Sequence, residues 1–161
     1  MSFASRETIF QALFALLCAV KPPKSVCADE DDLVWNETGR DLKSWDQVPA
    51  ANQPALFMPQ STQHASMETF GLSQWRLSAT AWIYYRTDGI SDPATPRDQA
   101  VNQVIDAIEA AINPYPGELQ TLGGLVIHTY IDGAVVFDSG LTDPQAVILV
   151  PITMLIGALG I

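Results

Sequence analysis

The chain has 161 residues, of which 48% are hydrophobic and 16% are charged, and this composition indicates one folded domain rather than a disordered chain. Eight Lys and Arg residues stand against 18 Asp and Glu residues, so the formal net charge is −10. A chain this acidic lacks the basic stripe that neutralises phosphates, which excludes a protein that wraps nucleic acid.

Residues 6 to 19 predict an amphipathic helix near the N-terminus. Ser5 can cap its first turn, and Pro22-Pro23 ends it, because proline cannot continue a helix. The apolar side chains at helical spacing, with two aromatic residues beside them, are Ile9, Phe10, Leu13, Phe14, Leu16, Leu17 and Val20.

The same residues leave an alternative open, namely a secretory signal peptide. Arg6 precedes the apolar run, as in a signal peptide, whereas Glu7 neutralises its charge and Gln11 interrupts the run. The two cysteines, Cys18 and Cys27, are fewer than a disulfide framework usually needs, which favours a reducing compartment. A cleaved signal would instead indicate a small secreted or periplasmic binding protein.

The segment that follows is expected to be mostly loop. The acidic run at 29–32 lacks the alternating ligands and central glycine of a calcium loop, so we expect a solvated loop there. Pro49 and Pro54 bracket a turn, and Ala55 to Met58 predicts a short strand. This proline-bracketed stretch is expected to turn the chain from helix to sheet.

Two further expectations concern the surroundings of that turn. Trp45 and Val48 are expected to pack beneath the loop that contains them. Gln60 to Gly71 is polar, so we expect a loop or a hairpin tip with His64 exposed on it.

The clearest strand signal is the alternation over residues 75 to 86. One side carries Trp75, Leu77, Ala79, Ala81, Ile83 and Tyr85, and the other carries Arg76, Ser78, Thr80, Trp82, Tyr84 and Arg86. Aromatic residues and arginine are enriched at protein–protein contacts. The candidate residues of a subunit or partner interface are therefore Arg76, Trp82, Tyr84 and Arg86, together with Trp45; the alternative is a solvated face with scattered aromatic residues.

A second helix is predicted between Thr95, its cap, and Asn113-Pro114, which ends it. Pro96 occupies the first helical position, where proline is well tolerated. The apolar stripe of this helix is Val101, Val104, Ile105, Ile108 and Ile112, and it is expected to lie flat on a sheet.

A hairpin and a final strand complete the predicted elements. Asp132-Gly133 is a two-residue turn signal between strands at 125–132 and 134–138, and this pairing would place His128 opposite Phe137. Gln145 to Ile156 predicts the last strand, in which Pro151 marks a bulge or an unpaired edge position.

Together these elements predict an α+β fold, with a mostly antiparallel sheet of about four strands and two main helices packed on one face. A single domain is expected over residues 1–161, with an apolar C-terminal tail at 155–161. The final 16 residues are apolar or nearly so, but a membrane span needs about 20, and Pro151 and two glycines interrupt them, so no membrane partner is expected.

The sequence contains no recognisable catalytic or ligand-binding motif. The chain has no nucleophile elbow, no Walker loop, no dinucleotide fingerprint and no His or Cys pair at ligand spacing. We therefore expect no enzyme, no cofactor and no metal.

Four motifs, taken in order, resemble the bacteriophage tail terminator (tail completion, minor tail) family of long-tailed phages. Each motif alone is weak, but the ordered set covers most of the chain. The motifs are the helix from Arg6 to Leu17, the stretches Arg40 to Pro49 and Gln53 to Phe57, the helix Ala107 to Ile112 with its exit Gln120 to Val126, and the segment Gln145 to Pro151. The acidic insert at 28–38 and the tail after Met154 are longer than in the family pattern.

The resemblance implies a structural virion protein of the tail and neck, present in the host cytoplasm during assembly. It implies a ring, usually of six copies, that caps the head-proximal end of the tail tube, stops tube polymerisation and joins the tail to the head connector. The implied partners are other copies of the chain, the major tail tube protein and the connector or stopper protein, while DNA passes through the lumen without specific binding. Another neck or head–tail joining protein is the nearest alternative.

Overall fold

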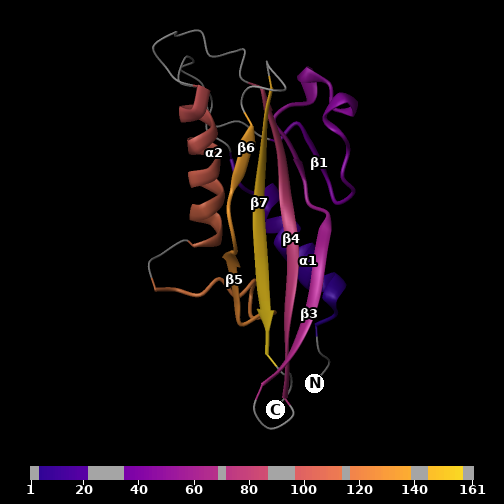
Figure 1. Ribbon diagram of the computed structural model, residues 1–161, viewed down its shortest axis with the longest axis vertical. Coiled ribbons are helices and arrows are strands. Elements are labelled where there is room, and N and C mark those ends of the chain that lie inside the picture. The colour runs from indigo at the N-terminus through magenta and orange to yellow at the C-terminus, as the bar shows by residue number, and fades with distance from the viewer. Residues whose placement is uncertain are drawn as a thin grey trace.

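Figure 1 shows a computed structural model of the chain, which describes residues 4–21, 35–68, 72–86, 97–113, 117–138 and 145–157. Within these residues the fold is α+β, with two α-helices and a mixed, mostly antiparallel sheet of seven strands. The helices are α1 (Arg6–Cys18) and α2 (Arg97–Ile112). The strands are β1 (Glu37–Gly39), β2 (Ala55–Phe57), β3 (Gln60–Glu68), β4 (Leu72–Arg86), β5 (His128–Ile131), β6 (Val136–Asp138) and β7 (Gln145–Ile156).

The two long strands β4 and β7 form the centre of the sheet. They pair antiparallel from Trp75 opposite Ile156 to Arg86 opposite Gln145. The alternation predicted for β4 is confirmed from Arg76 to Ile83, where every second residue is buried. It is weaker at the ends, because Trp75 is half-buried and Tyr84, predicted on the other side, is buried together with Tyr85. The bounds predicted for the last strand are also confirmed.

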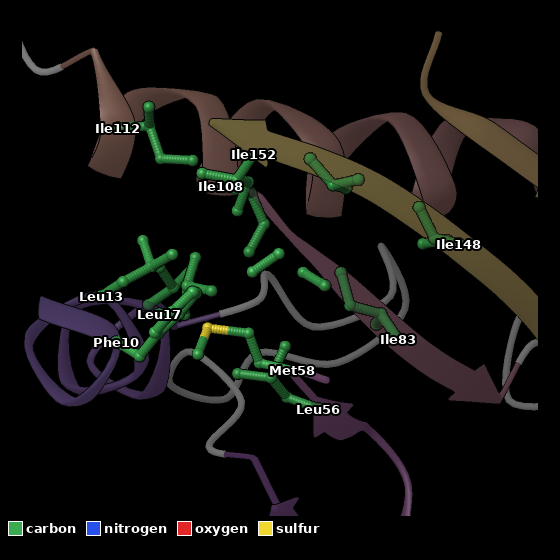
Figure 2. Close-up of a cluster of buried hydrophobic side chains, with 14 of the residues drawn as sticks. Phe10, Leu13, Leu17, Leu56, Met58, Ile83, Ile108, Ile112, Ile148 and Ile152 are labelled. Carbon is green, nitrogen blue, oxygen red and sulfur yellow. The ribbon is translucent and has the colours of Figure 1, made fainter. Parts of the chain in front are cut away.

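One core holds both helices against the same face of this sheet, which we call the inner face. Figure 2 shows Leu13 and Leu17 of α1 and Ile108 of α2 pointing toward Ile83 of β4 and Ile152 of β7. The buried residues of α2 agree with the apolar stripe predicted for that helix. The four that are completely buried recur at spacings of three and four, and they are Val101, Val104, Ile108 and Ile112. Helix α1 begins as expected, with the side chain of its N-cap accepting a hydrogen bond from the backbone of the third helical residue.

The expectation of about four strands is wrong. The edge of each central strand that faces away from the other pairs with two separate strands in succession. Strands β2 and β3 both pair with β4, and β5 and β6 both pair with β7. Strand β1 adds a parallel edge beside β2. The sequence predicted short strands over β2 and β6, so the strands that it missed are β1, which is only three residues long, and β3.

The predicted hairpin at Asp132-Gly133 is wrong, because β5 and β6 do not pair with each other. They follow one another along the same edge of β7, with His128 opposite Leu155 and Phe137 opposite Ile148. The strand breaks where the Asp132 N–H donates to the Pro151 carbonyl at 3.1 Å. The N–H and C=O of a strand residue point to the same neighbour, so Pro151 offers this edge an acceptor but no donor.

The expected loop at Gln60 to Gly71 contains instead the edge strand β3, which pairs with β4 as far as Glu68 opposite Leu72. Its side chains from Ser61 to Ala65 are exposed, so neither face needed apolar residues and no alternation marked the strand. His64 is exposed, as predicted, but it lies opposite Arg76 on the sheet rather than on a loop.

The proline-bracketed stretch folds into two short 3₁₀ turns, Trp45–Gln47 and Ala50–Asn52, before β2. Gln53 has extended backbone geometry, and its peptide bond to Pro54 is cis. Val48 is buried as expected, whereas the Trp45 side chain is 50% exposed, so the expectation that it packs beneath the loop is wrong.

Several predictions fall outside the described residues. These are the helix end at Pro22-Pro23, the acidic run at 29–32, the cap at Thr95-Pro96 and the end of the C-terminal tail at 158–161. Among the described helices, neither is long and apolar enough to span a membrane.

Candidate functional site

The sheet face turned away from the helices, which we call the outer face, carries the predicted interface residues of β4. Alternation places Arg76, Trp82, Tyr84 and Arg86 on this face, because the residues between them point into the core. Arg76 and Arg86 are exposed, and Trp82 is half-buried. The structure therefore brings four of the five candidate residues to one face but exposes them unequally.

Tyr84 contacts its own chain rather than solvent. Its side chain is 2% exposed, its ring lies 5.8 Å from the ring of Phe57, and its hydroxyl donates to the Lys43 carbonyl at 2.7 Å. Burial, and to a lesser degree the nearby Asp46 carboxylate, raise the pKa of the Tyr84 hydroxyl. We therefore assign Tyr84 to holding residues 43–57 over one end of the outer face.

Ionic and amide contacts fasten the same covering segment. The Glu37 carboxylate accepts hydrogen bonds from the Lys43 ammonium and from the Asn52 amide, the latter at 2.9 Å. These two hydrogen bonds hold the pKa of Glu37 below its ordinary range. Trp45 lies on the covering segment with half of its side chain exposed, so it remains available to a partner.

Beyond the covered end, β7 contributes mainly apolar side chains to the outer face, whereas β4 contributes the polar Ser78 and Thr80, and Ser78 hydrogen-bonds Thr153 of β7 at 3.3 Å. In β7 the outward residues Val147, Leu149, Pro151 and Leu155 are half-buried, and Val136 of β6 is 54% exposed. A strand that is apolar on both sides is typical of a sheet covered on both faces. The described residues cover the inner face with two helices and the outer face at one end only.

At the opposite end of the outer face, two histidines and one arginine lie in a row across four neighbouring strands, with a leucine between the arginine and the second histidine. Adjacent pairing places His64 of β3 beside Arg76 of β4, Arg76 beside Leu155 of β7, and Leu155 beside His128 of β5. These are the two histidines of the chain. Spacing in the sequence could not have brought them together, because the order of the strands in the sheet decides the row.

His128 also borders an open groove of about 620 Å³ on the flank of the sheet. The groove is lined by Asp106, Glu109, Ala110 and Asn113 of α2, by Gly117, Glu118 and Leu119 of the following loop, and by His128. The His128 ring stacks on Tyr130 with the ring centroids 5.4 Å apart rather than on Phe137, and its Nδ1 has no hydrogen-bond partner among the residues that the structure describes. The expectation that His128 lies opposite Phe137 is therefore wrong.

The acidic lining of this groove was missed from the sequence. A signal existed, since Asp106, Glu109 and Asn113 recur at spacings of three and four on the polar side of α2. Nothing in the sequence indicated that Glu118 and Leu119, which follow the helix, would lie beside it. Within the described parts of the chain, no group of three His, Cys, Asp or Glu residues could hold a metal ion.

Comparison with known proteins adds no assignment, since neither a family model nor a curated protein matches this chain.

Proposed function

We propose that the protein is a structural component of a phage virion that forms a ring, of six copies as the resemblance implies, at the head-proximal end of the tail tube. The ring would end tube polymerisation and join the tail to the head connector. The proposal depends on the ordered set of four sequence motifs. In the structure, each motif lies on a helix, a strand or the segment that covers the outer face.

Each motif lies on an element with a definite role in the fold. The first is α1, which fills the core. The second is the segment that covers one end of the outer face and leads into β2. The third is the end of α2 and the loop that returns to the sheet, and the fourth begins the central strand β7. An ordered resemblance that follows the architecture supports the proposal more than scattered matches would.

The surfaces of the sheet also support a ring. Strand β7 presents half-buried apolar side chains on the outer face, and the edge strands β3 on one side and β5 with β6 on the other pair with only one neighbouring strand among those described. Unpaired strand edges and half-covered apolar surface are features of proteins that bind other subunits.

The charge of the chain suits passage of DNA through the ring. Each copy carries a formal net charge of −10, so six copies would carry −60. A lumen of this sign repels phosphates instead of binding them, and DNA would move through it without sticking.

The proposal is tested with the purified chain and the tail tube protein of the same phage. Light scattering should give a mass of about 105 kDa for six copies of the 17.5 kDa chain. Negative-stain images of tubes polymerised with the chain should show limited lengths and extra density at one end. Tubes of uncontrolled length with bare ends would contradict the proposal, and density on the connector alone would favour another neck protein.

A further inference from the structure

We propose that neighbouring copies of this chain bind head to tail through opposite edges of the sheet. The donor surface, which we call the β3 edge, consists of Gln60–Ser66 with Arg76. The receiving surface is the groove of the next copy, lined by Asp106, Glu109, Glu118, Leu119 and His128. This inference rests on the proposed ring and identifies the two surfaces that would close it.

The β3 edge has the properties of a strand that another chain covers. Among the described strands, β3 pairs with β4 alone, so its other side presents unpaired backbone N–H and C=O groups. Proteins usually protect such an edge with lysine, proline or charged side chains. Residues 60 to 66 contain none of these, and Ser61 to Ala65 are exposed. A β-bulge, another protective device, is confined to the start of the strand between Gln60 and Gln63, so the edge from Gln63 to Ser66 is regular.

Arg76 supplies this edge with a cation that is free to bind. Its side chain is exposed and lies beside His64 on the outer face. Three other described cations are engaged, since Arg40 pairs with Glu7, Lys43 pairs with Glu37, and the Arg6 guanidinium lies 4.3 Å above the Trp75 ring. Arg76 takes part in none of the described ion pairs.

The groove on the other flank offers the complementary charge. Asp106, Glu109 and Glu118 are exposed, and none of them pairs with a described cation. Leu119 is 59% exposed at the same place, so the groove combines carboxylates with an apolar side chain. A planar guanidinium fits this setting, because it binds carboxylates in a forked geometry and packs its stem on apolar groups.

The placement of the two surfaces favours a ring over a symmetric pair. In the order of the sheet, β3 lies beside β4 at one edge, and β5 lies beside β7 at the other. Figure 1 shows β3 on one side of the long central strands and α2 with β5 on the other. A contact between two different patches on opposite sides is heterologous, and it repeats from copy to copy until the rotation closes.

Charge exchange tests the inference on the full-length chain. Arg76→Glu and Glu109→Arg should each raise the concentration at which the ring assembles by about tenfold, because each places like charges together. The double variant should assemble like the parent chain. Mixing the two single variants should also restore the ring, with alternating copies. Lys21→Glu makes the same change of charge at an exposed position on another surface and should leave assembly unchanged.

The outcomes separate this inference from the proposed function. If the parent chain forms the ring and Arg76→Glu assembles equally well while remaining folded by circular dichroism, the two surfaces are wrong and the ring stands. If the double variant and the mixture both fail to assemble, direct pairing of Arg76 with the groove is also wrong. If the parent chain is a monomer alone and on tail tubes, the proposed function is overturned, and this inference with it.

Discussion

Replacing Tyr84 with phenylalanine should loosen the segment that covers one end of the outer sheet face. The substitution keeps the ring that packs 5.8 Å from Phe57 and removes only the hydroxyl, which donates to the Lys43 carbonyl at 2.7 Å. The carbonyl belongs to an exposed residue, so water can take the place of the lost donor. The expected cost is therefore that of one ordinary hydrogen bond and not that of a buried unpaired group.

A hydrogen bond of this kind contributes about 1 kcal/mol to the free energy of unfolding. For a domain of this size, that loss lowers the melting temperature by about 2–4 °C. The aromatic packing should be retained, so the slope of the urea transition should not change.

Urea unfolding followed by tryptophan fluorescence measures the effect. Tyr130→Phe is a matched control, because it removes a hydroxyl from a half-buried tyrosine for which the structure shows a stacking contact with His128 but no hydrogen bond. If Tyr84→Phe is as stable as Tyr130→Phe, the bond to Lys43 does not hold the segment, and our account of the covered end is wrong.

The same tyrosine predicts a pH dependence. Burial raises the folded-state pKa of Tyr84 above its ordinary value of 10.0. Its contribution to stability is therefore fully present below pH 10 and is lost as the pH rises through the folded-state pKa, because the unfolded chain ionises first. Melting temperatures measured from pH 8 to pH 11 should fall less steeply for Tyr84→Phe than for the parent chain; equal slopes would contradict this.

Three further predictions concern other parts of the fold. Leu13→Ala should lower the free energy of unfolding by about 2–5 kcal/mol in urea titrations, because Leu13 is fully buried, whereas exposed Gln11→Ala should change it by less than about 0.5 kcal/mol. Glu37→Gln should reduce the loss of stability on acidification, since the lowered pKa of Glu37 contributes stability above about pH 4.5 that disappears as the pH falls; an unchanged acid slope would refute it. Gly133→Ala should cost about 1–3 kcal/mol because φ is +114° there, and a neutral result would mean that the break between β5 and β6 tolerates a side chain.

The sequence determined the elements whose burial pattern repeats over many residues. β4 and β7 were predicted within a few residues, and α1 was predicted almost to its observed end. These segments bury one side along their whole length, so the period of apolar residues follows the period of the backbone. The α+β class followed from them.

The edges of the sheet were determined by tertiary structure. Strand β3 is polar on both sides, so only its pairing with β4 makes it a strand. Asp132-Gly133 is a strong hairpin signal in isolation. However, the strand before it, β5, and the strand after it, β6, both pair with β7 instead of with each other. Local turn chemistry therefore allowed a hairpin, and competition for hydrogen bonds along β7 excluded it.

The candidate site divides in the same way. The sequence alone placed Arg76, Trp82, Tyr84 and Arg86 on one face of one strand, because alternate side chains of a strand must point the same way. It could not tell that Tyr84 is covered by its own chain while Arg76 is free, since covering depends on where distant residues fold. The acidic groove likewise exists only because the loop after α2 brings Glu118 back beside the helix, and contacts between segments far apart in the chain leave no periodic trace in the sequence.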